Sequence, residues 1–200
     1  VFQAFFLQRF PPVPVMQPEE VLLFAEYFDE HLLLALPHRQ FVFTFPKALR
    51  VFLRYDQRLF GRISRLIFSL IAEFYSAAAA KPISSAAVLA YQPFGDALRF
   101  NPHFHALILD GGFDPEGKFY FLPIHDTAPL AQLLRQRTVG LFLKLGLITE
   151  QFILGTISVF LPTSSRSVDG SVRIPAASSR TREALSQYIA RAPVSLSKLV

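Results

Sequence analysis

The sequence contains no cysteine among its 200 residues, which excludes a disulfide-bonded scaffold, a thiolate zinc site and thiol catalysis. It also lacks any uninterrupted run of about 18 apolar residues, the length that a membrane-spanning helix needs. Charged residues are scarce at 18%, whereas hydrophobic residues make up 52%, so the chain is too apolar to remain disordered. A chain of this size can build one medium-sized domain with a substantial core.

The charges that are present favour the positive sign. Twenty lysine and arginine residues oppose fifteen acidic ones, which gives a net charge of +5 and an isoelectric point near 9.7. This excess favours a polyanionic partner such as nucleic acid, although many proteins without one carry as much. Basic residues recur every three or four positions along one predicted helix, a spacing that would form a phosphate-contacting stripe or an ordinary solvated face. They are Lys47, Arg50, Arg54, Arg58, Arg62 and Arg65.

The order of the predicted elements indicates an α+β fold. The predicted strands are short, aromatic or β-branched segments at residues 41–45, 86–92, 103–109 and 118–122, the last two forming a hairpin. The predicted helices lie at residues 19–36 and 48–80, where apolar residues recur at helical spacing, and at 128–145 and 181–192, the last with Thr181 as its N-cap. Residues 151–161 fit either a strand or a buried helix, and a short strand is expected at 171–174. Such irregular alternation is typical of a mostly antiparallel sheet with helices packed on its faces.

Composition divides the chain into four segments. They are an apolar, proline-ended tail (1–18), a core (19–150), a serine-rich connecting segment (151–180) and a terminal helix (181–200). The chain begins at Val1 and stops at Val200 inside an amphipathic segment, which favours a fragment.

The most informative string is Asn101-Pro102-His103-Phe104-His105. Alternate side chains of a strand share a face, so His103 and His105 point the same way, roughly 7 Å apart along the backbone. Phe104 then points toward the core. Two neutral imidazoles can share one divalent ion and leave coordination positions open for a substrate oxygen. The alternative is a pair of ordinary strand histidines, one at a sheet edge and one solvated.

A metal at this pair would need a third ligand from elsewhere. Gln92 ends the preceding predicted strand and could reach the same face. Asp96 lies in the turn that follows and offers a carboxylate, which suits magnesium or manganese better than an amide does. A turn or capping role is the alternative for Asp96. His38 and His125 have no evident partner and are predicted to lie at the surface.

Several other motifs accompany the histidine pair. They are Phe94-Gly95-Asp96 before it, Asp110-Gly111-Gly112 after it, the segment 37–47, Tyr55-Asp56-Gln57-Arg58-Leu59, and the segment 188–193 that begins with Tyr188. Together they resemble the HUH rolling-circle transposases of the IS-ninety-one and IS-eight-hundred-and-one type. The resemblance covers roughly residues 20–150 and 171–200.

This resemblance implies an HUH-nuclease-like central antiparallel sheet and an enzyme of DNA transposition and recombination. It implies that His103 and His105 bind a divalent metal ion, Mg or Mn, and that Tyr188 attacks the scissile phosphate. The partner would be single-stranded DNA at the ends of an insertion sequence, in the bacterial cytoplasm with the nucleoid and without a membrane. A packed helix tyrosine is the alternative for Tyr188.

Three departures from the family pattern leave other interpretations open. No cysteine-rich zinc region precedes the core, residues 151–167 lack an expected Trp- and His-containing segment, and Ala184 stands where some relatives have a second tyrosine. These departures favour a truncated or degenerate copy with a single-tyrosine mechanism. An inactive DNA-binding remnant and an unrelated metal-dependent hydrolase remain the alternatives.

Overall fold

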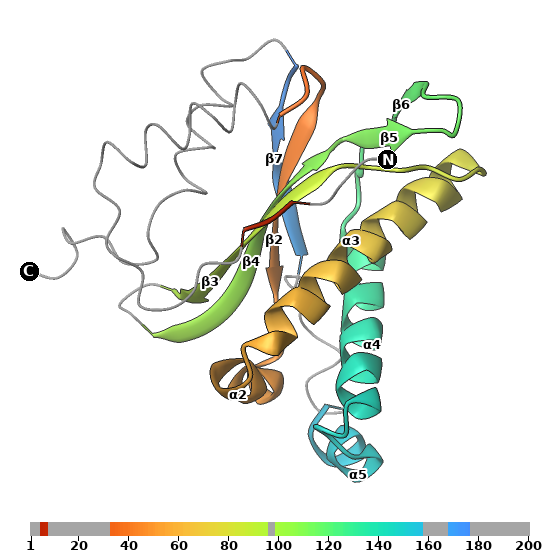
Figure 1. The fold of residues 1–200 in the computed structure, drawn as a ribbon. Helices are drawn as coiled ribbons and strands as arrows, with labels where there is room; N and C mark the ends of the chain where they lie inside the picture. Colours follow the sequence, from red (N-terminus) through yellow and green to blue (C-terminus); the bar gives the residue numbers. More distant parts are fainter. Residues whose placement is uncertain (1–4, 8–32, 96–98, 158–167, 177–200) are drawn as a thin grey trace, which may run out of the picture.

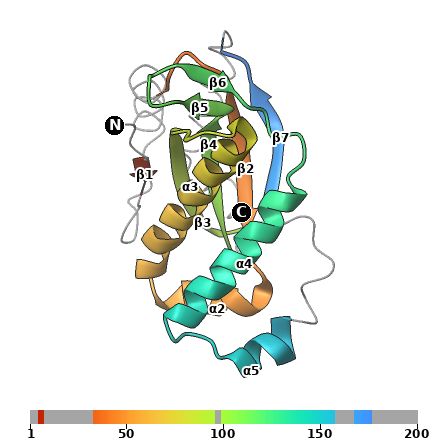
Figure 2. The same ribbon diagram turned by 90° about the vertical axis from the view of Figure 1, so that its right-hand side faces the viewer.

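A computed structural model describes residues 5–7, 33–95, 99–157 and 168–176, and the fold is given for these ranges. They form the α+β arrangement that the sequence predicts, with two long helices on one side of a sheet (Figures 1 and 2). The sheet has the order β1-β3-β4-β2-β7. Its strands are β1 (Phe5–Leu7), β2 (His38–Thr44), β3 (Ala87–Phe94), β4 (Phe100–Leu109) and β7 (Val168–Ile174). Every neighbouring pair is antiparallel except β1 and β3, which run parallel.

Strand β4 lies at the centre of the sheet, between β2 and β3. All six residues from Phe104 to Leu109 are buried, on both faces of the strand. A continuously buried run of this kind, apolar except for His105, is typical of a strand that is covered on both sides. Phe104, Ala106 and Ile108 join the core beneath the helices, and the alternate residues face the other way.

Two helices replace the single one predicted over residues 48–80, so that prediction is wrong. They are α2 (Lys47–Tyr55) and α3 (Arg58–Ala79). Asp56 separates them because its backbone is extended (φ −123°, ψ 98°) and its carboxylate accepts the Arg58 amide hydrogen at 3.0 Å. Asp56 is thus the C-cap of α2, and Gln57 is the N-cap of α3. A local bond from an aspartate side chain to the backbone competes with the continuation of a helix.

The core lies between the sheet and α3, and α4 (Ala128–Lys144) packs beside α3. Ile63, Ile67 and Leu70 of α3 are almost fully buried, and each such side chain stabilises the fold by about 1.5–3 kcal/mol. Phe52 of α2 meets Phe142 of α4 edge to face at 5.6 Å, so all three helices share one apolar interior.

The predicted hairpin between residues 103–109 and 118–122 is also wrong. A separate two-stranded sheet forms from β5 (Gly111–Phe113) and β6 (Phe119–Phe121). Gly111 makes this possible, because it adopts a positive φ of 148° and a Cβ there would lie 1.9 Å from the Tyr120 carbonyl oxygen. The chain therefore leaves the main sheet after β4 and pairs with itself.

The remaining predictions have mixed outcomes. Residues 150–157 are helical, as α5 (Glu150–Phe152) and a π-helical turn (Ile153–Ile157), but none of residues 150–155 is buried, so the segment is neither the strand nor the buried helix that the pattern allowed. The strand expected at 171–174 is confirmed but begins at Val168. Residues 33–36 are not helical, and the rest of the helix predicted at 19–36 and all of that at 181–192 lie outside the described residues.

None of the described helices is long and apolar enough to cross a bilayer.

Candidate metal centre

His103 and His105 lie on the same face of β4, as their spacing predicts. Their ring centroids are 4.8 Å apart and the ring planes meet at 72°. Phe104 points to the opposite face, where its ring lies 5.8 Å from Phe45 and 5.2 Å from Tyr91. The alternation of the strand thus places two imidazoles side by side and anchors the residue between them in the core.

The backbone fixes the tautomer of His103. Its Nδ1 lies 2.6 Å from the carbonyl oxygen of Asn101, and because a carbonyl only accepts, Nδ1 must carry the hydrogen. The lone pair of a neutral His103 is then on Nε2. Metal-binding histidines usually donate their other ring hydrogen to a carbonyl or carboxylate in this way.

His105 is only 3% exposed, and its Nδ1 lies 3.5 Å from the Gln40 side-chain nitrogen. Its strand partners are small apolar residues, Val42 on β2 and Ala90 on β3. Burial, together with neighbouring His103, lowers the pKa of His105 from 6.5 to about 4. His105 is therefore neutral at neutral pH, which is the form that binds metal ions.

This low pKa makes the stability of the metal-free protein depend on pH. Between pH 6.5 and about 4 the unfolded chain protonates His105 whereas the folded chain does not. The contribution of His105 to stability should therefore be constant above pH 6.5 and be lost progressively on acidification toward pH 4, by up to about 3 kcal/mol. Urea unfolding in a chelator at several pH values measures the effect.

A comparison of slopes isolates the contribution of His105. His105→Gln should flatten the pH dependence over this interval, whatever its effect on absolute stability, because glutamine does not titrate. His125→Gln, at an exposed histidine, should keep the slope of the unmodified protein. Equal slopes for the protein and for His105→Gln would contradict the assignment.

Gln92 is placed where a third ligand would be needed. It is the direct strand partner of His103 across the β3–β4 pair, so the two side chains share a face with Cβ atoms about 5 Å apart. Asp96 lies outside the described residues. Within the described ranges, no group of three or more His, Cys, Asp and Glu side chains could hold a metal ion. Binding of a divalent ion by the two imidazoles, with Gln92 or Asp96 as a third ligand, thus stays a prediction.

The prediction for the other two histidines is half right. His125 is exposed, whereas His38 is 4% exposed and its Nδ1 lies 2.8 Å from the Leu36 carbonyl oxygen. The difference arises because β2 begins three residues earlier than predicted. His38 is thereby paired between Leu109 and Ile174 within the sheet.

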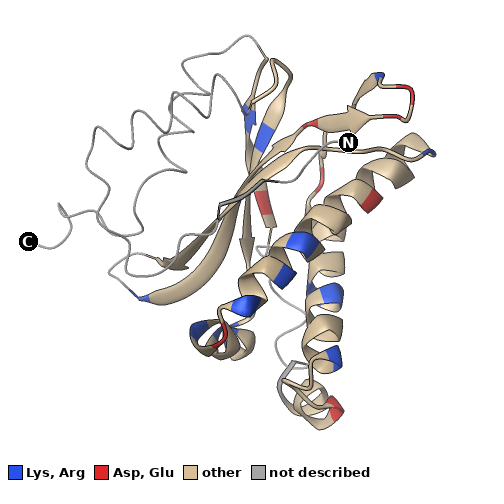
Figure 3. Ribbon diagram, in the orientation of Figure 1, with Lys and Arg blue, Asp and Glu red and all other residues tan. Residues whose placement is uncertain are grey.

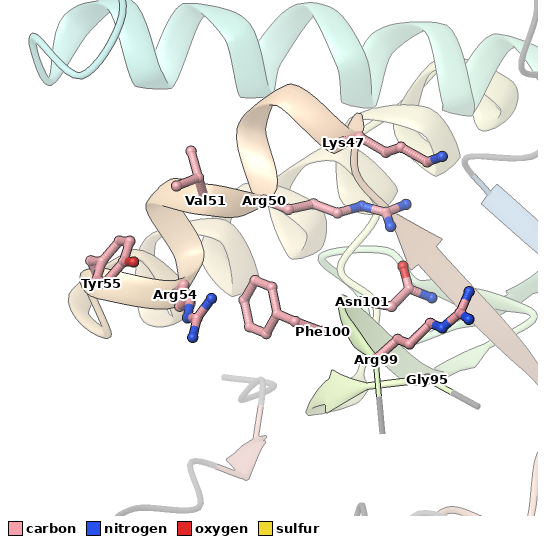
Figure 4. A pocket seen from close by; sticks show the side chains of 9 residues that line it. All are labelled: Lys47, Arg50, Val51, Arg54, Tyr55, Gly95, Arg99, Phe100 and Asn101. Atoms are coloured by element: carbon pink, nitrogen blue, oxygen red, sulfur yellow. The ribbon is translucent and has the colours of Figure 1, made fainter. Parts of the chain in front are cut away.

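The predicted basic stripe is divided by the break between α2 and α3. Lysines and arginines (blue in Figure 3) follow α2 and the start of α3. Arg58 is held by Asp56 through two side-chain contacts, at 2.9 and 3.1 Å. Arg62 and Arg65 are exposed on α3. Three of the predicted basic residues, Lys47, Arg50 and Arg54, instead line one groove (Figure 4). Arg99, which was not among the predicted residues, lines the same groove.

Asp110 has a structural role that its position in a Gly-rich turn did not indicate. Its carboxylate, 1% exposed, receives two hydrogen bonds from the Arg39 guanidinium, at 3.1 and 3.3 Å. Arg39 also donates to the carbonyl oxygens of Ile124 and Gly170. This buried ion pair joins β2, the β4–β5 turn and β7.

Comparison with known proteins adds one match. A family model described as "Putative transposase" matches residues 87–200, which is more than half of the chain. The matched part includes both histidines of β4 and Tyr188, which lies outside the described residues. No curated protein and no solved structure matches the chain.

Proposed function

This chain belongs to that transposase family, and from this premise we propose that it nicks and rejoins single-stranded DNA by tyrosine transesterification. Membership of the family gives the chain a role in transposition and DNA as its partner. The finer proposal is that it acts as an HUH rolling-circle transposase of the kind its motifs resemble. One observation carries it, the pair of neighbouring imidazoles on β4 with the His103 Nδ1 hydrogen engaged by the backbone.

In the proposed reaction the Tyr188 oxygen attacks the scissile phosphorus. The bond from phosphorus to the 3′ oxygen breaks, the 3′ oxygen takes up a proton, and the 5′ phosphate remains on tyrosine. Attack of another 3′-hydroxyl on this phosphotyrosine reverses the step and rejoins the strand. One phosphodiester is exchanged for another throughout, so no nucleotide cofactor is consumed.

The phenol of a tyrosine has a pKa near 10 and is a weak nucleophile at neutral pH, so the site must favour loss of its proton. Magnesium or manganese, bound by His103 and His105 with Gln92 or Asp96, would supply Lewis-acid neutralisation of phosphate charge. The chain's own contribution is to present two imidazole nitrogen donors at a fixed separation on a rigid strand.

Covalent capture of DNA tests the proposal. The protein is incubated with Mn²⁺ and a random-sequence pool of single strands labelled at the 3′ end, and then denatured. Because tyrosine retains the 5′ phosphate of the downstream fragment, the label should migrate with the protein. A pool labelled at the 5′ end should leave the protein unlabelled.

Tyr188→Phe should abolish the adduct, because it removes only the attacking oxygen. Tyr120→Phe is a matched control, since the Tyr120 hydroxyl contacts Lys81 at 2.6 Å near the β5–β6 hairpin. It should keep the adduct. An adduct that survives in Tyr188→Phe, or none from the unmodified protein, would reject the proposed activity.

The same assay distinguishes the two alternatives. A DNA-binding remnant would retain the strand on a native gel and give no covalent product. A metal-dependent hydrolase with the same histidine pair would release shortened strands with no label on the protein.

A further inference from the structure

A groove of about 830 Å³ separates α2 from the adjoining ends of β3 and β4 (Figure 4). Lys47, Arg50 and Arg54 line it from the helix, and Arg99 lines it from the strand side. Figure 4 shows the Arg50 side chain extending from α2 toward Asn101. We call this feature the basic groove.

The charged side chains that the structure describes around the basic groove are all positive. None of the described residues that line it is acidic, and Lys47, Arg54 and Arg99 are exposed. Arg50 is half-buried, and its Nε donates to the Phe45 carbonyl oxygen at 2.9 Å, which directs its guanidinium along the groove. Several cationic side chains, placed along a groove by two different segments, match the successive phosphates of a nucleic-acid strand better than they match a single small anion.

Aromatic rings lie among these cations. The Arg54 guanidinium carbon is 5.8 Å from the Tyr55 ring centre and 6.0 Å from that of Phe100. Tyr55 is 77% exposed, unusually high for a large aromatic side chain, and Phe100 is half-buried. Aromatic faces beside arginines are the surfaces on which unpaired bases stack.

Asn101 connects the basic groove to His103. Asn101 lines the groove, and its backbone oxygen is the acceptor for His103 Nδ1. Its side-chain Oδ1 is buried and has no hydrogen-bond partner in the described part of the chain. Buried acceptors are almost always bonded, so this atom offers an acceptor position for a donor group of a bound strand.

We infer that the basic groove binds the unpaired strand next to the scissile phosphate, with its cations on phosphates and with Tyr55 and Phe100 against bases. That this strand is DNA rests on the proposed function. Stacking makes the site selective, because the faces of bases in a duplex are already covered by their neighbours. Phosphate contacts alone would not distinguish a single strand from a duplex.

Equilibrium binding to the full chain in a chelator tests the inference without cleavage. The probes are a fluorescent random-sequence single strand and a duplex of the same length. Tyr55→Ala should weaken single-strand binding by about fivefold or more and leave duplex binding unchanged. Tyr55→Phe should restore the loss, because it keeps the ring.

The arginines are tested through salt dependence. Arg54→Ala and Arg99→Ala should each weaken binding and reduce the slope of log K against log salt by about 0.7, the value for one phosphate contact on a single strand. Arg137→Ala is the matched control, because it removes an exposed arginine of α4 that is paired with Glu73 and does not line the groove. It should change neither quantity.

Three results would overturn the inference. They are unchanged single-strand binding in Tyr55→Ala, equal losses for single strand and duplex, and a loss in Arg137→Ala as large as in Arg54→Ala. Failure of the proposed function is separate. If the groove variants lose binding but the unmodified protein forms no adduct, nicking is rejected and strand binding by the basic groove is supported. If the adduct forms and the groove variants bind normally, nicking is supported and strand binding by the groove is rejected.

Discussion

His103→Ala is expected to weaken Mn²⁺ binding by at least about tenfold and to leave the protein folded. The substitution removes the nitrogen donor whose tautomer the Asn101 carbonyl fixes. His103 is only half-buried, so truncation to alanine should cost little core packing. Isothermal titration with Mn²⁺, together with circular dichroism, measures both outcomes.

The control is His125→Ala, which removes an exposed histidine away from β4. It should bind Mn²⁺ as the unmodified protein does. Mn²⁺ should also raise the melting temperature of the protein and of His125→Ala but not that of His103→Ala, because a ligand stabilises only the state that binds it. Equal affinities in the two variants would show that the pair on β4 is not the metal site.

Asp110→Ala is expected to destabilise the protein by about 3–5 kcal/mol, an amount that can unfold a domain of this size. The change leaves the Arg39 guanidinium, 4% exposed, without its carboxylate partner. Arg173, whose Nε lies 3.7 Å from the same carboxylate, loses a weaker contact. Chemical denaturation followed by circular dichroism gives the free energy of unfolding.

A double substitution tests whether uncompensated charge is the cause. Replacing both Arg39 and Asp110 with leucine should be less damaging than Asp110→Ala, because it leaves no buried charge unpaired. Glu116→Ala, at an exposed position in the β5–β6 turn, should stay within about 0.5 kcal/mol of the unmodified protein. An Asp110→Ala protein as stable as Glu116→Ala would refute the role assigned to the ion pair.

The sequence predicts those features that depend on local periodicity. The two-residue spacing of His103 and His105 correctly predicts a shared face, because every strand alternates in this way. The helix predicted over 128–145 is found at Ala128–Lys144. The α+β class follows from the number and kind of these elements.

Features that depend on distant contacts could not be predicted in this way. Arg39 and Asp110 are 71 residues apart, and no spacing rule joins them. Arg99 enters the basic groove only because the end of β4 packs beside α2. The break at Asp56 is a local feature, because this aspartate bonds the amide of Arg58, two residues along the chain. The apolar pattern continues across the break and therefore predicts one helix.

The central position of β4 has a consequence for how a metal ion would be received. With hydrogen-bonded neighbours along both edges, the segment from His103 to Leu109 can open only if three strands separate together. Its amide hydrogens should therefore be among the slowest in the molecule to exchange with deuterium. The backbone that carries the two imidazoles would therefore be ordered before a cation binds. The affinity of the site for that cation would not be reduced by the entropy of ordering the chain.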